Sequence, residues 1–447
     1  MGRGRAGPGG DDEQMSKRVV IVGGGFGGMY TARHLERRLP AGTAEIVLVN
    51  PENFMLFTPL LPEAASGLIE PRHVVVPLRR VLRRTRLLLG RATAIDLQGR
   101  TVTVTPPEGP PRTVGWDRLV LAAGSVSRLL PIPGLAERAR GFKTLAEGIY
   151  LRNHVLQQLE LADAAETESE RLSRCTFVSV GAGYAGTELV AELQSLTMRA
   201  LAAYPGLRPR DVRWILVDAA PMILPELGRD LARAALRTLR RRGVDVRLET
   251  QVKEVGDGWV LLSDGERIPT HTFVWTAGIT PQPTVSRLGL PTDQRGRVLV
   301  DRHLAVRGRE DVFALGDVAA VPDPASPGHP APPTSQHALR EARACAANVA
   351  ASLGEGERVP FTYRGLGLLV NLGEYRAVGR VLGVPVSGFP CWVLTRAYHL
   401  AAMPTWSRRF RIGLDWFVAL ISPRDIAELG SLGRRDALAL SAGEPRE

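Results

Sequence analysis

The sequence predicts an α/β protein with two Rossmann-like dinucleotide-binding domains, and three observations support this fold class. Four apolar residues, 19–22, run directly into a cluster of glycines. The same arrangement returns where the strand-like segment 175–180 meets Gly181. After a helix-length interval, each cluster is followed by a second apolar strand, at 45–50 and at 213–218. With 447 residues, of which 44% are apolar, the chain can form two or three domains.

The first unit is a βαβ motif. A continuous apolar run such as 19–22 is typical of a strand buried on both faces of a parallel sheet. A helix is expected from Gly27 to Leu39, ending before Pro40, and the strand 45–50 follows it. The second strand should lie parallel to the first, joined by a right-handed crossover.

The second unit repeats this order, with a strand at 175–180, a helix at 186–198 and a strand at 213–218. Both glycine clusters have G-x-G-x-x-G spacing, on Gly23, Gly25 and Gly28 and on Gly181, Gly183 and Gly186. The first glycine allows a tight turn, the second lets a pyrophosphate approach the backbone, and the third lets helix and strand pack closely. The helix N-terminus then offers free N–H groups to the phosphates.

The polar residue that closes the second strand differs between the units. In the later unit it is Asp218, which can accept hydrogen bonds from both ribose hydroxyls of an adenosine. The first arginine after it is Arg229, so no nearby cation welcomes a 2′-phosphate, and NAD(H) is favoured over NADP(H). In the earlier unit the residue is Asn50. Two dinucleotide sites in one chain favour a flavin dinucleotide paired with a nicotinamide dinucleotide.

The amino-acid composition narrows the functional classes that the chain can belong to. The three cysteines have no C-x-x-C spacing, which argues against a disulfide framework and against a zinc site, so no metal is expected. A net charge of +11 favours anionic partners, but no nucleic-acid-binding motif accompanies it. Residues 1–15 are expected to form a disordered tail. The most apolar stretch, 386–406, contains prolines and charges and is a poor membrane span.

Further segments resemble one family. They are "NPENFMLFTPLLPEAASG" (50–67), "DRLVLAAGS" (117–125), "FVWTAGITPQP" (273–283), "DVFALGDVA" (311–319) and "TSQHALREA" (334–342). Together with the two glycine clusters, they resemble the pyridine-nucleotide-disulfide-reductase-like flavoproteins. Within these the chain is most similar to the type II NADH dehydrogenases, the non-proton-pumping NADH:quinone oxidoreductases. The resemblance covers residues 17–430.

This resemblance implies a domain layout. It places the tail at 1–15, a discontinuous FAD-binding domain at 16–130 and 291–355, an NAD(H)-binding domain at 131–290 and a C-terminal module at 356–447. It also implies that NADH passes a hydride to FAD, and that the reduced flavin passes two electrons to a quinone. No protein nucleophile is then needed, because the protein positions the rings.

The resemblance also assigns residues. The FAD would contact Gly23, Gly25, Phe26, Gly27, Gly28, Asn50, Ala123, Gly124, Gly316 and Asp317. The NADH would contact Gly181, Gly183, Tyr184, Gly186, Asp218 and Gly278. Glu188 would act near the nicotinamide and the flavin, and Gln336 would act on the quinone side with Ser335 and Arg340. Each of Glu188 and Gln336 can also be read as an ordinary polar residue near a helix start.

The C-terminal module is expected to touch a membrane. Residues 391–421 interleave aromatic residues with arginines, which describes an interfacial helix better than a spanning one. The aromatic anchors would be Trp392, Tyr398, Trp406, Trp416 and Phe417, and the cations Arg396, Arg408, Arg409 and Arg411. The expected location is the cytoplasmic face of the cell membrane, otherwise the cytoplasm. The same helix could instead be buried against the protein or form a homodimer interface.

Alternatives stay open at this stage. A sulfide:quinone oxidoreductase needs a cysteine pair beside the flavin, and Cys175, Cys345 and Cys391 are not placed to provide one. An NAD(P)H-dependent flavoprotein reductase of another acceptor and a redox-sensing protein that binds both cofactors are also compatible with the motifs.

Overall fold

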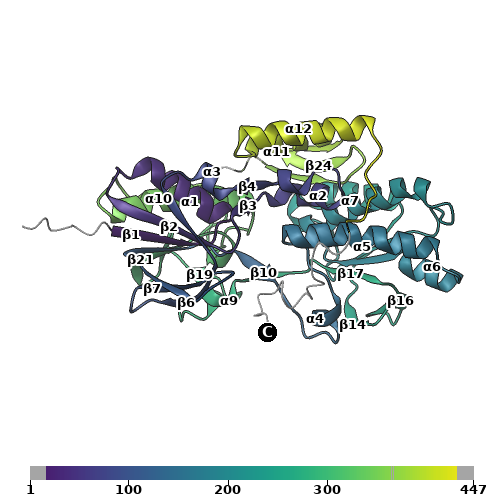
Figure 1. Cartoon of the computed structure of the whole chain (residues 1–447), viewed down its shortest axis with the longest axis horizontal. Helices are drawn as coiled ribbons and strands as arrows, with labels where there is room; N and C mark the ends of the chain where they lie inside the picture. The colour runs from purple at the N-terminus through teal and green to yellow at the C-terminus, as the bar shows by residue number, and fades with distance from the viewer. Residues whose placement is uncertain (1–16, 364, 366, 430–447) are drawn as a thin grey trace, which may run out of the picture.

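The computed structural model describes residues 17–429 except 364 and 366. The predicted tail, 1–15, and the last part of the predicted C-terminal module, 430–447, lie outside the described residues. Within the described residues, the predicted α/β class with parallel sheets is confirmed. Figure 1 shows two large α/β units with a smaller layer across one side.

The first unit is built on a six-stranded sheet in which distant parts of the chain meet. Its order is β20-β21-β9-β1-β2-β5, and all neighbours are parallel except β20 and β21. The predicted strands pair in register, with Val20 opposite Val47. The strands are β1 (Lys17–Val22), β2 (Ala44–Asn50), β5 (Thr85–Leu89), β9 (Arg118–Leu121), β20 (Ala305–Val306) and β21 (Arg309–Ala314). Helices α1 (Phe26–Arg38) and α10 (Ser335–Ser352) pack against each other beside this sheet.

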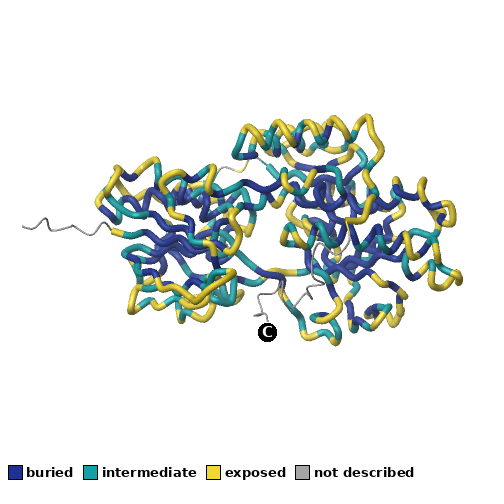
Figure 2. The backbone as a smooth tube through the Cα atoms, viewed as in Figure 1, coloured by how far each residue is buried: buried dark blue, intermediate teal, exposed yellow. Residues whose placement is uncertain are grey.

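The second unit is built on a four-stranded parallel sheet with the order β13-β12-β11-β17. Its strands are β11 (Thr176–Val180), β12 (Arg213–Val217), β13 (Val244–Arg247) and β17 (Thr272–Trp275). Its helices are α4 (Leu135–Arg138), α5 (Leu145–Asp163), α6 (Glu168–Arg174), α7 (Tyr184–Ala200) and α8 (Arg229–Arg241). Each unit has its own core, and Figure 2 shows both sheets as buried.

Both glycine-linked helices begin earlier than predicted. Helix α1 starts at Phe26 and α7 at Tyr184, because the second glycine of each cluster, Gly25 or Gly183, is the N-cap. The sequence predicts these starts at Gly27 and at Gly186. The earlier start points the free N–H groups of the first turn at the space beside the second glycine.

Smaller sheets and short helices complete the two units. The sheets are β3 (Phe54–Leu56) with β4 (Val75–Pro77), β6 (Arg91–Asp96) with β7 (Thr101–Thr105) and β8 (Arg112–Gly115), β10 (Ser125–Ser127) with β18 (Ile279–Pro281), β14 (Val252–Gly256) with β15 (Trp259–Leu262) and β16 (Arg267–Pro269), and β19 (Val298–Leu299) with β22 (Ala319–Ala320). The helices are η1 (Thr58–Leu60), α2 (Leu61–Ala65), η2 (Pro71–His73), α3 (Leu78–Val81), η3 (Leu201–Ala203), η4 (Pro225–Leu227), α9 (Pro283–Ser286) and η5 (Gly316–Val318).

The C-terminal layer lies across one side of both units. It contains an antiparallel sheet of β23 (Gly367–Asn371), β24 (Ala377–Val381) and β25 (Val384–Gly388), followed by α11 (Phe389–Ala402) and α12 (Trp406–Ile421). Helix α12 forms the outermost edge, drawn yellow at the top of Figure 1, with one end toward α3. Figure 2 shows that much of this helix is exposed.

Candidate functional site

The turn between β1 and α1 is closed to side chains at its first and third glycines. Gly23 has φ +105°, and a Cβ there would lie 2.3 Å from the Ala122 oxygen. A Cβ on Gly28 would lie 1.7 Å from the Gly23 oxygen. A Cβ on Gly25, by contrast, would meet nothing within 4 Å. The packing therefore explains two glycines without a ligand, whereas Gly25 leaves open space at a helix N-terminus.

The turn between β11 and α7 repeats this geometry. Gly181 has φ +108°, and a Cβ on Gly186 would lie 1.9 Å from the Gly181 oxygen. Gly183 again has no atom within 4 Å of an added Cβ. The second unit therefore offers a second helix N-terminus with room for a phosphate beside it.

A cavity of about 560 Å³ lies between the two units and receives both helix starts. This volume falls in the usual range for small-molecule sites. The cavity is lined by twelve of the predicted residues, Gly25, Phe26, Gly27, Ala123, Gly124, Tyr184, Glu188, Gly278, Gly316, Asp317, Ser335 and Gln336. The others do not line it, namely Gly23, Gly28, Asn50, Gly181, Gly183, Gly186, Asp218 and Arg340.

The residues that close the second strands hold the glycine turns. Asn50 Oδ1 accepts a hydrogen bond from the Gly24 N–H at 2.7 Å. Asp218 Oδ2 accepts one from the Ala182 N–H at 2.5 Å, and its Oδ1 accepts another from the Ala220 N–H at 2.7 Å. Each side chain is therefore fixed beside its turn, and only Asp218 brings a negative charge there.

A polar chain that was not predicted crosses the cavity wall. The Lys143 ammonium donates to Ser125 Oγ at 2.6 Å, and Ser125 Oγ donates to Asp317 Oδ2 at 2.6 Å. Lys143 belongs to the second unit and Asp317 to the first, and β10, which carries Ser125, lies between them. Burial lowers the pKa of Lys143, and the charges of Asp317 and Glu147 oppose that shift. These hydrogen bonds thus place the cation of Lys143 and the anion of Asp317 in the same wall of the cavity.

A buried acid supports the turn that carries Asp317. Gly316 has φ +71°, and its N–H donates to Glu341 Oε2 at 2.7 Å. Burial raises the pKa of Glu341 to about 7. Glu341 was not predicted, although it lies one residue after Arg340 in the segment that resembles the quinone-side helix.

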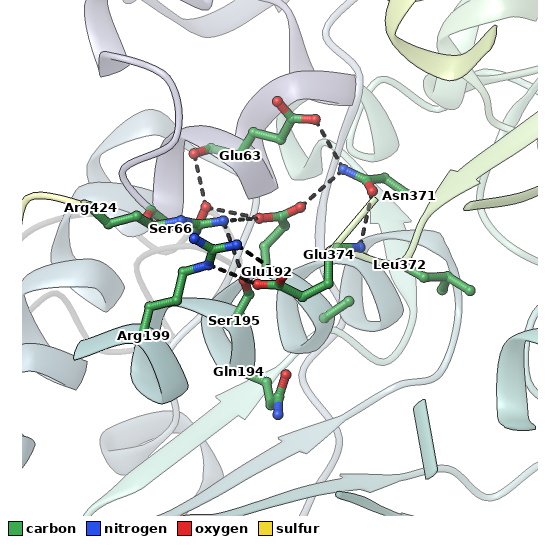
Figure 3. A network of polar contacts seen from close by, with 12 residues as sticks. Glu63, Ser66, Glu192, Gln194, Ser195, Arg199, Asn371, Leu372, Glu374 and Arg424 are labelled. Carbon is green, nitrogen blue, oxygen red and sulfur yellow. Dashed lines mark hydrogen bonds and ion pairs between the residues drawn. The ribbon is translucent and has the colours of Figure 1, made fainter. Parts of the chain in front are cut away.

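Glu188 is joined to two further buried acids through one asparagine. The Asn371 N–H donates to Glu188 Oε1 at 2.8 Å. The Asn371 amide nitrogen also donates to Glu63 Oε1 and to Glu192 Oε1, each at 3.0 Å, as Figure 3 shows for the last two. Burial raises the pKa of Glu188 to about 8, so this side chain carries a proton at neutral pH.

The same acids bind the C-terminal layer to the two units. Glu63 Oε2 accepts a hydrogen bond from the Trp416 indole at 2.6 Å and lies 3.6 Å from the Arg396 guanidinium. Glu192 Oε2 lies 3.6 Å from the Arg424 guanidinium. Burial raises the pKa of Glu63, with the cation of Arg396 opposing the shift. Trp416 and Arg396 therefore face inward, so the prediction that they face a membrane is wrong.

The quinone-side residues lie where α10 begins. Gln336 lines the cavity, and its amide nitrogen donates to the Gly367 oxygen at 3.1 Å. Its Oε1 is buried and has no hydrogen-bond partner among the described residues. Arg340 is not in the cavity wall. Its guanidinium donates to the backbone carbonyl oxygen of Gln336 at 2.9 Å and lies over the Tyr363 ring. Two residues of α11 that were not predicted as cavity residues, Tyr398 and His399, complete this end.

The outer face of α12 is strongly apolar and exposed. The exposed fractions reach 78% for Trp406, 66% for Phe410 and 69% for Ile421, and Leu414 and Phe417 lie exposed between them. Aromatic and aliphatic residues with this exposure mark a contact surface. No helix within the described residues is long and apolar enough to cross a membrane.

The described residues place no cysteine in the cavity wall and contain no cluster of potential metal ligands. The three cysteines are buried and unpaired, and none lines the cavity. No group of three or more potential metal ligands occurs in the described part of the chain.

Comparisons with known proteins agree with this geometry. Residues 17–342 match the pyridine nucleotide-disulphide oxidoreductase family. The chain is 32% identical to the type II NADH:quinone oxidoreductase Ndh of Mycobacterium tuberculosis, over 91% of this chain and 89% of that protein. It is also 32% identical to the demethylphylloquinone reductase NdbB of Synechocystis, over 89% and 95%.

A solved structure shares the fold. NDH2 of Plasmodium falciparum in complex with NADH superposes with a TM-score of 0.84 at 16% identity, covering 92% of this chain and all of that one. The two glycine turns and the cavity between them agree with these relatives. The chain belongs to the pyridine nucleotide-disulphide oxidoreductase family and, within it, to the type II NADH:quinone oxidoreductases.

Proposed function

We propose that this protein holds FAD, oxidises NADH and reduces a quinone at the surface of a membrane. The observation that carries this proposal is that one cavity receives the N-termini of two dinucleotide-type helices, α1 and α7. The net reaction consumes NADH, one proton and a quinone and yields NAD⁺ and a quinol. Bound FAD would supply the chemistry that accepts a hydride from the nicotinamide and returns two electrons to the quinone.

The protein's residues fit the two dinucleotides. The open space at Gly25 and at Gly183 accommodates a pyrophosphate at each helix N-terminus. We assign the α1 turn to FAD because Asp317 and Gly316 line the cavity on that side. We assign the α7 turn to NADH, because the Asp218 carboxylate can bind ribose hydroxyls and would repel a 2′-phosphate. We also propose that 16–130 and 291–355 form one domain around a second domain, 131–290, and the strands of the two largest sheets, which fall within these bounds, support this division.

Two side chains handle protons and the quinone in this proposal. Glu188 is protonated at neutral pH and lines the cavity beside the α7 turn, where it can hold a proton near the nicotinamide. Gln336 presents a buried Oε1 that has no hydrogen-bond partner in the described part of the chain, and this oxygen can accept a hydrogen bond from a quinol hydroxyl. Ser335 lines the same end of the cavity, whereas Arg340 does not line it and donates a hydrogen bond to the backbone oxygen of Gln336.

The apolar face of α12 supports peripheral attachment to a membrane. Quinones dissolve in lipid, so the enzyme must reach the membrane to bind one. Helix α12 belongs to the same C-terminal layer as α11, which contributes Tyr398 and His399 to the cavity wall. We place the enzyme on the cytoplasmic side of the cell membrane, where NADH is available. A homodimer stays a prediction, which sedimentation velocity of the detergent-free protein would test.

Spectra and turnover test the proposal. The purified protein should be yellow, NADH should bleach the flavin absorbance, and a soluble ubiquinone or menaquinone analogue should restore it with continuous turnover. Bleaching without turnover would instead support a redox sensor, and turnover with NADPH alone would support a different reductase. A colourless protein that binds no dinucleotide would refute the proposal. Sulfide-dependent quinone reduction is not expected, because the described residues place no cysteine at the cavity.

A further inference from the structure

The two oxygens of the Glu188 carboxyl group differ in what they contact. Oε1 accepts a hydrogen bond from the Asn371 N–H at 2.8 Å. Oε2 forms no hydrogen bond within the described residues, and the side chain lines the cavity. Because an N–H group can only donate, Oε1 must be the accepting oxygen. The proton of the uncharged acid therefore lies on Oε2, which is free to meet a bound ligand.

The backbone N–H of Asn371 is held in place by the side chain of the same residue. Its Nδ2 group donates to Glu63 Oε1 and to Glu192 Oε1, each at 3.0 Å. Its Oδ1 accepts the Gly373 N–H at 3.0 Å. Both amide hydrogens are thus used, and only 6% of the residue is exposed. Moving this residue would leave several buried polar atoms without partners, so its backbone is strongly fixed.

The groups that meet at Asn371 come from three elements. Glu63 belongs to α2 and Glu192 to α7, whereas Asn371 ends strand β23 of the C-terminal layer. Figure 3 shows the two acids converging on the asparagine. Glu188 lies one turn before Glu192 on α7, so the same helix carries the acid of the cavity wall and an acid that anchors Asn371. The place at which the C-terminal layer docks therefore fixes the hydrogen-bond donor of Glu188.

Burial and hydrogen bonding act on Glu188 in opposite directions. Burial is the main cause of its raised pKa, and the charges of two neighbouring acids raise that pKa further. The Asn371 N–H lowers the pKa, because it stabilises the charged carboxylate. Loss of this N–H would thus raise the pKa, whereas entry of water would relieve the burial and lower it. The ionisable groups that face Glu188 or its acid neighbours come from α2, α7, α11 and the segment after α12, and they are Glu63, Glu192, Tyr184, Arg396 and Arg424.

We propose that Asn371 is a positioning residue for NADH oxidation, which holds Glu188 with its protonated oxygen, Oε2, toward the bound dinucleotide. This inference rests on the proposed role of Glu188 beside the nicotinamide. It gives the C-terminal layer a part in the NADH half of the reaction, separate from membrane contact. A purely structural asparagine would instead fasten β23 to the helices without affecting the rate or the pH dependence of flavin reduction.

Flavin reduction in N371A, compared with a matched control, tests this role. The control is E374Q, because Glu374 lies in the turn after β23 and binds Ser195 and Arg199 of α7. Both variants loosen the same turn from α7 and should lower Tm, but only N371A removes the anchors of the N–H donor. Anaerobic stopped-flow absorbance measures the rate at which NADH bleaches the flavin, from about pH 6 to about pH 9.

The two variants should differ in both rate and pH dependence. In wild type, bleaching should slow above about pH 8, as Glu188 loses its proton. N371A should bleach on the order of tenfold more slowly at neutral pH, because the carboxyl group is no longer held toward the dinucleotide. Its decline should begin at higher pH than in wild type, because the N–H that favours the charged form is lost. E374Q should stay within about twofold of wild type, with an unchanged pH dependence.

A conservative variant keeps the test open if N371A does not fold. N371S retains a hydroxyl donor for one acid, so it should show both changes to a smaller extent. Equal slowing in N371A and E374Q, with the pH dependence of wild type, would make Asn371 a structural anchor only. A decline that begins at lower pH in N371A would mean that the side chain merely shields Glu188 from water. Either result, with bleaching in wild type, would overturn this inference alone, whereas wild-type flavin that NADH cannot bleach would refute the proposed function and this inference with it.

Discussion

The two glycine turns are built alike and differ at the residue that fastens each to its neighbouring strand. In both, the first and third glycines are imposed by backbone packing and the second opens onto free space. Asn50 holds the first turn through the Gly24 N–H, and Asp218 holds the second through the Ala182 N–H. The shared hydrogen bond shows that this position is first a structural clamp. The charge of Asp218 is an addition that only the second turn has.

A second difference follows from the same contact. A Cβ on Gly24 would lie 2.7 Å from the Asn50 side chain, whereas the second turn carries Ala182 at the matching place. The helices differ too, since α7 places the buried acid Glu188 where α1 has Tyr30. Asp218 thus gives the second turn a negative charge that Asn50 does not give the first, which supports the proposed assignment of NADH to the second turn.

The largest expected effect comes from the third glycines. In G28A the new methyl would collide with the Gly23 oxygen at 1.7 Å, so α1 must move away from its strand. We expect loss of bound flavin and a destabilisation of about 1–3 kcal/mol or more, measured as the flavin absorbance of the purified protein and its Tm. Retention of full flavin content with an unchanged Tm would show that the turn is looser than described.

The buried acid Glu188, which α7 has and α1 lacks, predicts a pH effect. The pKa of Glu188, about 8, lies above its ordinary value of 4.5, so the folded state keeps a proton that the unfolded state releases. Between these values the unfolded state binds fewer protons, and stability falls as pH rises. As pH rises from 5 to 8, the free energy of unfolding of E188Q should increase by about 2 kcal/mol or more relative to that of wild type. The Tm difference between the two proteins, followed over this pH range, measures the effect. A difference that stays constant with pH would mean that Glu188 is ionised when buried.

The second glycines should separate the two ligands. An added methyl at Gly25 or Gly183 meets no protein atom, so both variants should fold. G25A should lose flavin, whereas G183A should keep flavin and bind NADH roughly ten- to a hundredfold more weakly, because accommodating the methyl costs about 1–3 kcal/mol. Flavin content and the KM for NADH distinguish the two outcomes. Equal effects of both variants on flavin content would contradict the assignment of the turns.

Exchanging the clamp residues sharpens the comparison. D218N keeps an oxygen for the Ala182 N–H but removes the charge, so the ratio of kcat/KM for NADH over NADPH should fall by about tenfold. N50D makes the reverse change in the first turn and should leave that ratio unaltered. A shift of the nicotinamide preference in N50D would assign the first turn to the nicotinamide.

The polar chain between the turns should affect the flavin modestly. K143M removes the ammonium from the cavity wall, and reduced flavin carries more negative charge than oxidised flavin, so its reduction should become harder. A tenfold change in that equilibrium corresponds to about 30 mV in the flavin potential. K143R keeps a cation at this position, so its flavin potential should stay close to that of wild type. An unchanged potential in K143M would show that the ammonium is neutralised by Asp317.

Local patterns were enough to predict the turns, and long-range contacts explain what was missed. The strands 19–22 and 45–50 and both glycine clusters are visible because strand, turn and helix signals lie next to one another. Asn371 could not be predicted, because it meets Glu63 and Glu192 only after distant segments have packed together. Lys143 was missed for the same reason.

The C-terminal helix shows the limit of composition. Alternating aromatic residues and arginines indicated an interfacial helix, and the exposed Trp406 and Phe410 agree with that pattern. The same pattern could not say which face would pack inward, and Trp416 with Arg396 turned out to contact the buried Glu63. Which aromatic residues are buried depends on the acids that α2 and α7 present, and those are set by tertiary structure.

The central claim is that two different dinucleotides meet in one cavity, and anaerobic mixing of the protein with NADH tests it most directly. Stopped-flow absorbance should show one equivalent of NADH bleaching the flavin in wild type, with the bleaching rate in G183A saturating only at much higher NADH concentration. The contradictory result would be flavin that NADH cannot bleach, or bleaching in G183A with the same concentration dependence as in wild type.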